Sequence, residues 1–191
     1  VGFAERPSRV ELVNLARRNE VPLVDDLGSG LLRNAPEVPW KDELEEDESI
    51  ALAIEQGVDL VCASGDKLLG GVQAGLIVGR ADLVERCRKH PLYRALRLDK
   101  MILAGLEATL QIHLESRTSV LYTWQFMERT ADECHRLALQ LAEGLPEVRV
   151  EESHSLVGGG SLPERRLSTW VVSIQSASAE EMAKQLRIGS P

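Results

Sequence analysis

Short apolar runs alternate with helical stripes over the first half of the chain. Strands are predicted where apolar residues run together, at residues 21–24, 60–63 and 75–79. Helices are predicted where apolar residues recur at helical spacing, at residues 8–19, 48–56 and 80–89. A strand–helix–strand order favours parallel neighbours in a sheet. The pattern therefore predicts an α/β fold with a mostly parallel sheet.

The second half of the chain has a different order of elements. Helical spacing predicts three further helices, at residues 99–113, 123–144 and 178–186. Alternating apolar and polar positions predict two strands, at residues 148–151 and 167–175. Between these strands lies the glycine-rich stretch 158–163, which by itself indicates only a flexible loop.

A single lysine stands between two of the predicted strands. The run 60–63 leads into Ser64, Asp66 and Lys67, and a glycine-rich turn then connects to the run 75–79. A lysine buried there would have a lowered pKa, and a neutral amine can attack a carbonyl to form a Schiff base. A pyridoxal phosphate (PLP) enzyme needs this arrangement. The alternative is a surface turn in which Lys67 points at water, and the spacing alone leaves both interpretations open.

Two aspartates, Asp25 and Asp26, follow the first predicted strand, where α/β folds bind ligands. The alternative is a helix cap or a turn, which is the commoner use of aspartate. The Gly28-Ser29-Gly30 stretch is not a dinucleotide fingerprint, because Arg33 replaces the third glycine and no helical pattern follows.

Composition narrows the class of protein. The chain has 191 residues, 43% of them apolar and 27% charged, which is typical of a soluble globular protein. Its net charge of −8 argues against a nucleic-acid clamp. The three cysteines are far apart in the sequence, which predicts free thiols in a reducing compartment. The four histidines lack the spacing of metal ligands, so we expect no metal site. No window approaches a membrane span and no signal-peptide pattern opens the chain, so we expect a cytoplasmic protein.

A second basic feature follows the strands. In the stretch of residues 90–100, Arg94 and Arg97 would share one helical face, a geometry suited to binding an oxyanion with paired donors. The alternative is an ordinary basic rim on an amphipathic turn.

The lysine turn also carries a family resemblance. The segment Ser64-Gly65-Asp66-Lys67-Leu68-Leu69-Gly70-Gly71, with Gln73-Ala74-Gly75 after it, resembles the cofactor-lysine segment of the bacterial selenocysteine synthases, the L-seryl-tRNA(Sec) selenium transferases. The similarity spans nearly the whole chain and is strongest over residues 21–30, 59–79 and 90–110. Val72 stands where the family usually has a proline. Measured against that longer family, the chain resembles an internal fragment.

The resemblance implies an aspartate aminotransferase-like, fold-type I PLP transferase. Residues 1–98 would be the C-terminal half of the cofactor-binding domain, 99–116 a connecting helix, and 117–191 an incomplete small α+β domain. The stretch 158–163 resembles a Ser-Leu-Pro element of that small domain.

The resemblance also implies a reaction, the β-replacement of seryl-tRNA(Sec) through an aminoacrylyl intermediate with selenophosphate as donor. Lys67 would hold PLP and then take the Cα proton, and Asp66 would shuttle a proton or bias the charge of Lys67. Asp26, or alternatively Asp25, would keep the pyridine nitrogen protonated, and Ser64 would bind the cofactor phosphate.

Further expectations come from the same resemblance. Arg94 and Arg97 would hold the phosphate of the selenium donor. The partners would be seryl-tRNA(Sec) and further copies of the chain in a dimer-based homo-oligomer or larger ring, with no DNA and no membrane.

Two other interpretations stay open. The chain could be a related PLP lyase or transferase that acts on a small amino acid or amino sugar, which the acidic net charge favours. It could also be a non-catalytic remnant of the fold, against which the intact Lys67, Asp26 and arginine pair argue.

Overall fold

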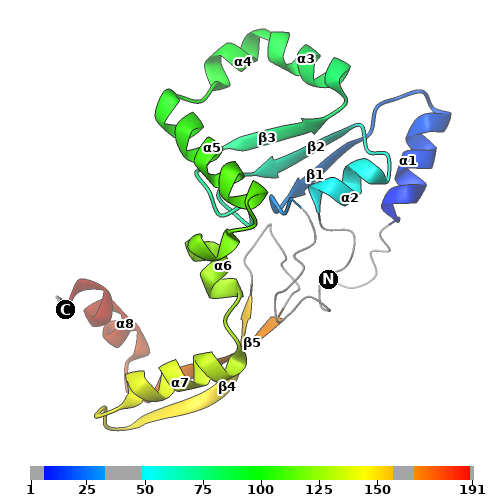
Figure 1. Cartoon of the computed structure of the whole chain (residues 1–191). Coiled ribbons are helices and arrows are strands. Elements are labelled where there is room, and N and C mark those ends of the chain that lie inside the picture. Colours follow the sequence, from blue (N-terminus) through cyan, green and yellow to red (C-terminus); the bar gives the residue numbers. More distant parts are fainter. Residues whose placement is uncertain (1–6, 33–48, 157–165, 190–191) are drawn as a thin grey trace. The chain divides into compact units, whose positions relative to one another are not determined.

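A computed structural model describes residues 7–32, 49–156 and 166–189 (Figure 1). These residues form two compact units, one of residues 7–32 and 49–128, the other of residues 129–156 and 166–189. The acidic stretch around Trp40 and the Ser-Leu-Pro element at residues 158–163 lie outside the described residues.

The first unit holds a sheet with helices around it. Its elements are α1 (Arg9–Arg18), β1 (Val24–Gly28), α2 (Ile50–Glu55), β2 (Leu60–Ser64), β3 (Gly75–Gly79), α3 (Ala81–Lys89), α4 (Pro91–Leu96), α5 (Lys100–Leu114), the 3₁₀ turn η3 (Thr118–Val120) and α6 (Tyr122–Met127). Capping explains two helix starts. Ser8 and Glu11 form a capping box at the start of α1, and the Asp99 carboxylate caps α5.

The sheet has the strand order β1-β2-β3. β1 and β2 pair in parallel across α2, which confirms the predicted strand–helix–strand unit and the α/β class. β3 pairs antiparallel with β2, so one of the two described pairings is parallel and the expectation of a mostly parallel sheet is not confirmed over these strands. The reason is the connection: residues 65–74 form a compact turn, and a parallel neighbour needs a longer crossover.

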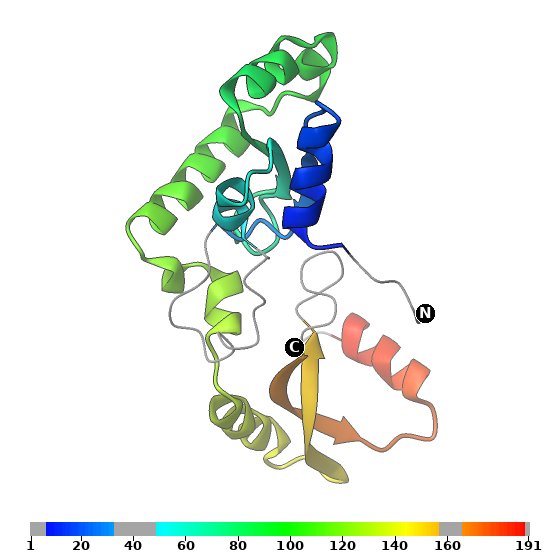
Figure 2. The ribbon, with the colours of Figure 1, turned by 90° about the vertical axis from the view of Figure 1, so that its right-hand side faces the viewer.

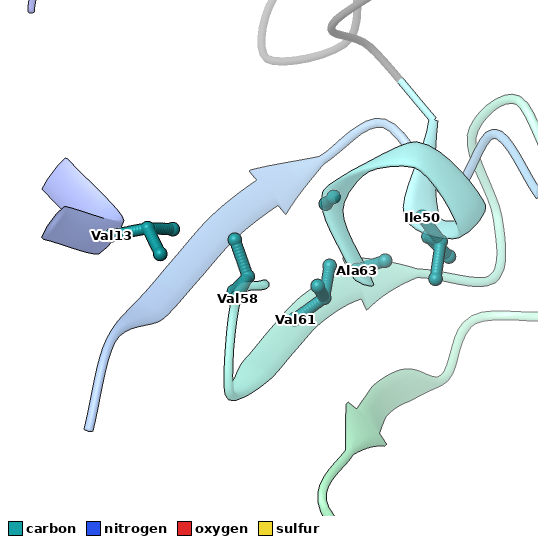
Figure 3. Close-up of a cluster of buried hydrophobic side chains, with 6 residues drawn as sticks. Val13, Ile50, Val58, Val61 and Ala63 are labelled. Carbon is teal, nitrogen blue, oxygen red and sulfur yellow. The ribbon is translucent and has the colours of Figure 1, made fainter. Parts of the chain in front are cut away.

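One cluster of apolar side chains packs α1 and α2 against the sheet (Figure 3). Val13 comes from α1, Ile50 from α2, and Val61 and Ala63 from β2. Val61 and Ala63 point to the same face because strand side chains alternate. The prediction of a buried strand is confirmed for β2, whereas β3 leaves Ile77 and Val78 47% and 41% exposed.

A second cluster packs α5 against the connection between β2 and β3. Leu69 and Ala74 of the connection are buried together with Leu106 of α5. Burial of this apolar surface places the long helix directly beside the turn that carries Lys67.

The second unit is a long β-hairpin with a helix on it (Figure 2). Its elements are α7 (Ala131–Ala142), β4 (Val148–Leu156), β5 (Arg166–Ile174) and α8 (Ala179–Ile188). β4 and β5 pair antiparallel over their full lengths. The imidazole of His135 on α7 stacks on Trp170 of β5, with ring centroids 3.9 Å apart.

The prediction of one helix over residues 123–144 is wrong. α6 ends at Met127, and α7 begins after Thr130, whose hydroxyl and backbone N–H form a capping box with Glu133. Such a box favours a new helix start over continuation of the old one.

Candidate functional site

The two aspartates of β1 lie on opposite faces of the sheet. In the parallel register Asp25 is opposite Val61 and Asp26 is opposite Cys62. Because aligned residues of neighbouring strands share a face, Asp25 points to the face that α1 and α2 cover, and Asp26 points to the other.

Asp25 is part of the structural framework. Its carboxylate accepts a hydrogen bond from Arg9 Nε at 2.8 Å, and Arg9 Nη1 donates to the Gln56 side chain at 2.8 Å. Arg9 is only 12% exposed, so the pair ties α1 to both β1 and the end of α2.

Asp26 is exposed and has no hydrogen bond or ion pair among the residues that the structure describes. Its negative charge is nevertheless felt by Cys62. Burial is the main reason why the pKa of the Cys62 thiol is raised, and the charge of Asp26 is the next contribution. Asp26 is therefore available for a ligand on this face of the sheet.

The loop after Asp26 needs its glycines. The ladder between β1 and β2 shifts between Asp26 and Gly28, a bulge of the kind that re-aims side chains beside active sites. Gly28 and Gly30 have φ values of 68° and 75°, in the left-handed region. A Cβ on Gly30 would collide with the Ser64 carbonyl oxygen, so glycine lets this loop approach the end of β2.

Lys67 lies in the turn that follows β2, and this turn contacts the loop after β1. The Leu68 N–H donates to the Ser29 carbonyl at 2.8 Å, and the Gly71 N–H closes the turn onto the Gly65 carbonyl at 2.8 Å. Sequence positions as far apart as 29 and 68 are thereby brought together.

The side chains at this turn are less buried than the sequence pattern suggests. Lys67 and Ser64 are half-buried and Asp66 is exposed. Of the two interpretations of Lys67, full burial between two buried strands does not hold, because Lys67 is half-buried and β3 is largely exposed on the described part of the sheet. A half-buried lysine at a strand end suits a ligand that has to enter from solvent.

Two ring N–H groups from α5 and α6 reach the same turn. Trp124 Nε1 donates to the Leu68 carbonyl at 3.0 Å, and His113 Nε2 lies 2.8 Å from the Leu69 carbonyl. Sequence reasoning did not single out either residue, since each meets its acceptor across more than forty residues of chain. The only local signal was a tryptophan inside a predicted helix.

Arg94 and Arg97 do not share a helical face. α4 ends at Leu96, and Arg97 has an extended backbone with ψ of 139°. That part of the prediction is wrong because the His90-capped helix α4 is only six residues long. Both side chains are exposed, Arg94 on the last turn of α4 and Arg97 directly after it.

Over residues 7–32, 49–156 and 166–189, no three His, Cys, Asp or Glu side chains gather as a metal site would need. No helix of those ranges is long and apolar enough to cross a membrane.

Comparison with known proteins identifies the family. A family profile described as L-seryl-tRNA selenium transferase matches residues 1–190. The chain belongs to this family. The resemblance seen in the lysine turn is therefore confirmed.

Two curated members of the family illustrate the similarity. The L-seryl-tRNA(Sec) selenium transferase of Haemophilus influenzae is 42% identical over 182 residues, which are 91% of this chain and 39% of the relative. That of Clostridium perfringens is 38% identical over 190 residues, 95% of this chain and 40% of the relative. The chain thus spans about 40% of the length of the curated relatives it matches.

A solved structure shares the fold. The superposition with a D-glucosaminate-6-phosphate ammonia-lyase covers 98% of this chain and 44% of the lyase chain, with a TM-score of 0.64 and 20% sequence identity. At this identity the likeness concerns the arrangement of helices and strands alone.

Proposed function

We propose that the full-length protein converts seryl-tRNA(Sec) to selenocysteinyl-tRNA(Sec), with PLP as cofactor and selenophosphate as selenium donor. Selenium takes the place of the β-hydroxyl oxygen of serine, and phosphate is the second product. The observation that supports the proposal is the hydrogen bond from the Leu68 N–H to the Ser29 carbonyl, in a chain that belongs to this family. This bond joins the turn that carries Lys67 to the loop that follows Asp26. The fold-type I architecture and the homo-oligomer expected from the sequence belong to the same proposal.

The described residues fit PLP by their chemistry. Lys67 offers an accessible amine for the cofactor aldehyde, and Asp26 offers a carboxylate that is not engaged by the described part of the chain. Ser64 adds a hydroxyl at the strand end. Bound PLP would supply an electron sink for the negative charge that forms at the substrate Cα.

Each side chain would then have a defined role. Lys67 Nζ would hold the cofactor and would accept the Cα proton of the substrate. Asp26 would hold a proton at the pyridine nitrogen, because a carboxylate stabilises the charged ring. Asp25 is less suited to this role, since it is paired with Arg9. The Ser64 hydroxyl would bind the cofactor phosphate, and exposed Asp66 would pass protons between Lys67 and solvent.

Arg94 and Arg97 bind the phosphate of selenophosphate. A guanidinium presents paired donors that match phosphate oxygens, and both groups are exposed and close in sequence on the described surface. The chain has a net charge of −8, which would repel an anionic selenium donor. A local pair of cations would attract the donor in spite of this overall negative charge.

The test is the visible absorption of the full-length protein with PLP, before and after borohydride, for wild type, Lys67→Ala and Lys100→Ala. We expect the band of bound PLP in wild type and in Lys100→Ala, the matched lysine control at the start of α5, but not in Lys67→Ala. Borohydride should fix the cofactor covalently to the peptide that contains Lys67. Addition of seryl-tRNA(Sec), but not of free serine, should then change the spectrum.

Three results would count against the proposal. No band in wild type would remove PLP from the protein. An unchanged band in Lys67→Ala would move the cofactor to another lysine. A spectral response to free serine as large as that to seryl-tRNA(Sec) would favour a small-molecule PLP enzyme.

A further inference from the structure

We propose that His113 and Trp124 are positioning residues for Lys67, because their ring N–H groups fix the turn that carries it. The inference rests on the proposed function, in which Lys67 binds the cofactor. Neither ring has to touch the cofactor or the substrate for this role.

The geometry is specific to two successive carbonyls. Trp124 Nε1 lies 3.0 Å from the Leu68 oxygen and His113 Nε2 lies 2.8 Å from the Leu69 oxygen. A carbonyl oxygen only accepts, so His113 carries a proton on Nε2. The two rings also meet edge to face, with centroids 6.0 Å apart and planes at 76°, so each restricts the rotation of the other.

The residue after Lys67 is consequently held at both of its peptide groups. The Leu68 N–H donates to Ser29 in the loop after β1, and the Leu68 carbonyl accepts from Trp124 on α6. The Leu68 side chain is only 2% exposed, which adds a third anchor. With Leu68 fixed, the backbone of Lys67 keeps one position relative to the loop that follows Asp26.

Close packing of α5 keeps the His113 bond short. A Cβ on Gly71 would lie 2.8 Å from Thr109 Oγ1, and a Cβ on Gly105 would lie 2.8 Å from Val72 Cγ1. The helix that carries His113 therefore lies directly against Gly71 and Val72 of the turn. A shift of the helix away from the turn would break these contacts and the bond together.

Loss of either ring donor leaves a buried carbonyl without its partner. An unpaired buried carbonyl destabilises this conformation of the turn, so turn conformations with a displaced Lys67 gain population. Apparent affinity for PLP falls in proportion to the competent fraction. We therefore expect a fall of about tenfold per donor removed, which corresponds to about 1.4 kcal/mol.

The experiment uses the full-length protein with Trp124→Phe, His113→Leu and His113→Gln. Trp124→Phe keeps an aromatic ring and removes the N–H, whereas His113→Gln introduces a side-chain amide that restores a donor. Trp170→Phe and His135→Leu are matched controls, since they alter the stacked Trp–His pair of the second unit. The readouts are PLP affinity, the pH midpoint of the PLP absorption band, melting temperature, and the rate at which acetic anhydride labels Lys67 relative to Lys100 without cofactor.

We expect Trp124→Phe and His113→Leu to weaken PLP binding about tenfold, shift the pH midpoint and speed Lys67 labelling, with His113→Gln close to wild type. Both controls should leave these readouts unchanged. Lower melting temperatures with unchanged affinity, midpoint and labelling would overturn the inference and leave the rings a purely structural role. Labelling needs no PLP, so it decides the inference even if wild type fails to hold the cofactor on Lys67, a result that would count against the proposed function instead.

Discussion

At the scale of single residues, Asp25 and Asp26 are adjacent in sequence and differ in their surroundings. Because side chains alternate along a strand, the two aspartates point to opposite faces of the sheet. Asp25 therefore forms an ion pair with Arg9, and Asp26 does not. The Asp25 carboxylate thereby holds α1 on the sheet, whereas the Asp26 carboxylate stays exposed.

This division of roles predicts different effects of two neighbouring substitutions. Asp25→Asn should lower the free energy of unfolding of the first unit by about 2 kcal/mol, because half-buried Arg9 loses its charged acceptor. Asp26→Asn should change it by less than about 0.5 kcal/mol, since Asp26 is exposed. Urea unfolding of the full-length protein, followed by hydrogen exchange of β1 and β2, measures both.

A second readout follows from the position of Asp26 beside Cys62. The charge of Asp26 contributes, after burial, to the raised pKa of the Cys62 thiol, so Asp26→Asn should lower that pKa. Alkylation of Cys62 at pH 8 should then be faster in the variant than in wild type. Equal alkylation rates, or a large loss of stability in Asp26→Asn, would contradict the assignment of the two carboxylates.

At the scale of elements, Asp59 connects residues at the starts of β1, β2 and α3. These starts lie at the end of the sheet opposite the turn that carries Lys67. Its carboxylate accepts from the Leu23 N–H at 2.8 Å and from Arg80 Nη1 at 2.9 Å, and Arg80 is the N-cap residue of α3. The bond from the Leu23 N–H is the main reason why the pKa of Asp59 is lowered, followed by the bond from Arg80.

This lowered pKa predicts that the contribution of Asp59 to the free energy of unfolding depends on pH. A carboxyl group whose pKa is lower in the folded state stabilises the fold above its unfolded pKa of about 3.9, and the contribution is lost as pH falls through the folded value. Asp59→Asn should therefore cost about 1 kcal/mol at pH 7, a modest figure because Arg80 is 56% exposed. Wild type and variant should converge as the pH falls through the lowered pKa of Asp59.

Urea unfolding at pH 7, 5 and 3 measures this difference. Asp82→Asn is the matched control, because the Asp82 pair with Arg80 is exposed on both sides and should contribute little at any pH. A cost of Asp59→Asn that is the same at all three pH values would show that packing, and not charge, sets the role of Asp59.

At the scale of the whole molecule, the described residues form two units, each with its own buried side chains. In the second unit Ala138 of α7 is 4% exposed. Ala138→Leu would overpack this site and should destabilise the second unit by about 1–3 kcal/mol. Amides of β4 and β5 should then exchange about tenfold faster with solvent, while those of β2 keep their wild-type rates.

Leu139→Ala, at the next position, is the control, because Leu139 is 51% exposed and its loss should change little. Hydrogen exchange followed by mass spectrometry reads both units in one experiment. Equal acceleration in β2 and β5 by Ala138→Leu would show that the two units unfold together.

The sequence by itself determined the features that depend on neighbouring residues. The Ser8 capping box, the Asp99 helix start and the strand before Lys67 each rest on positions a few residues apart. The motif that carries the family resemblance is also a run of consecutive residues around Lys67. The break between α6 and α7 belongs to this class too, since Thr130 and Glu133 carry a capping signal that the sequence analysis passed over.

Only the tertiary structure decided the features that depend on contacts between distant positions. The direction of β3, the pairing of Asp25 with Arg9, and the contact between the loops after β1 and β2 follow from packing across the sheet. The bonds from His113 and Trp124 to the lysine turn are of the same kind. Apolar periodicity predicts which face of a helix or strand is buried. It does not predict which distant donor binds which carbonyl, because many placements of a helix satisfy the same pattern.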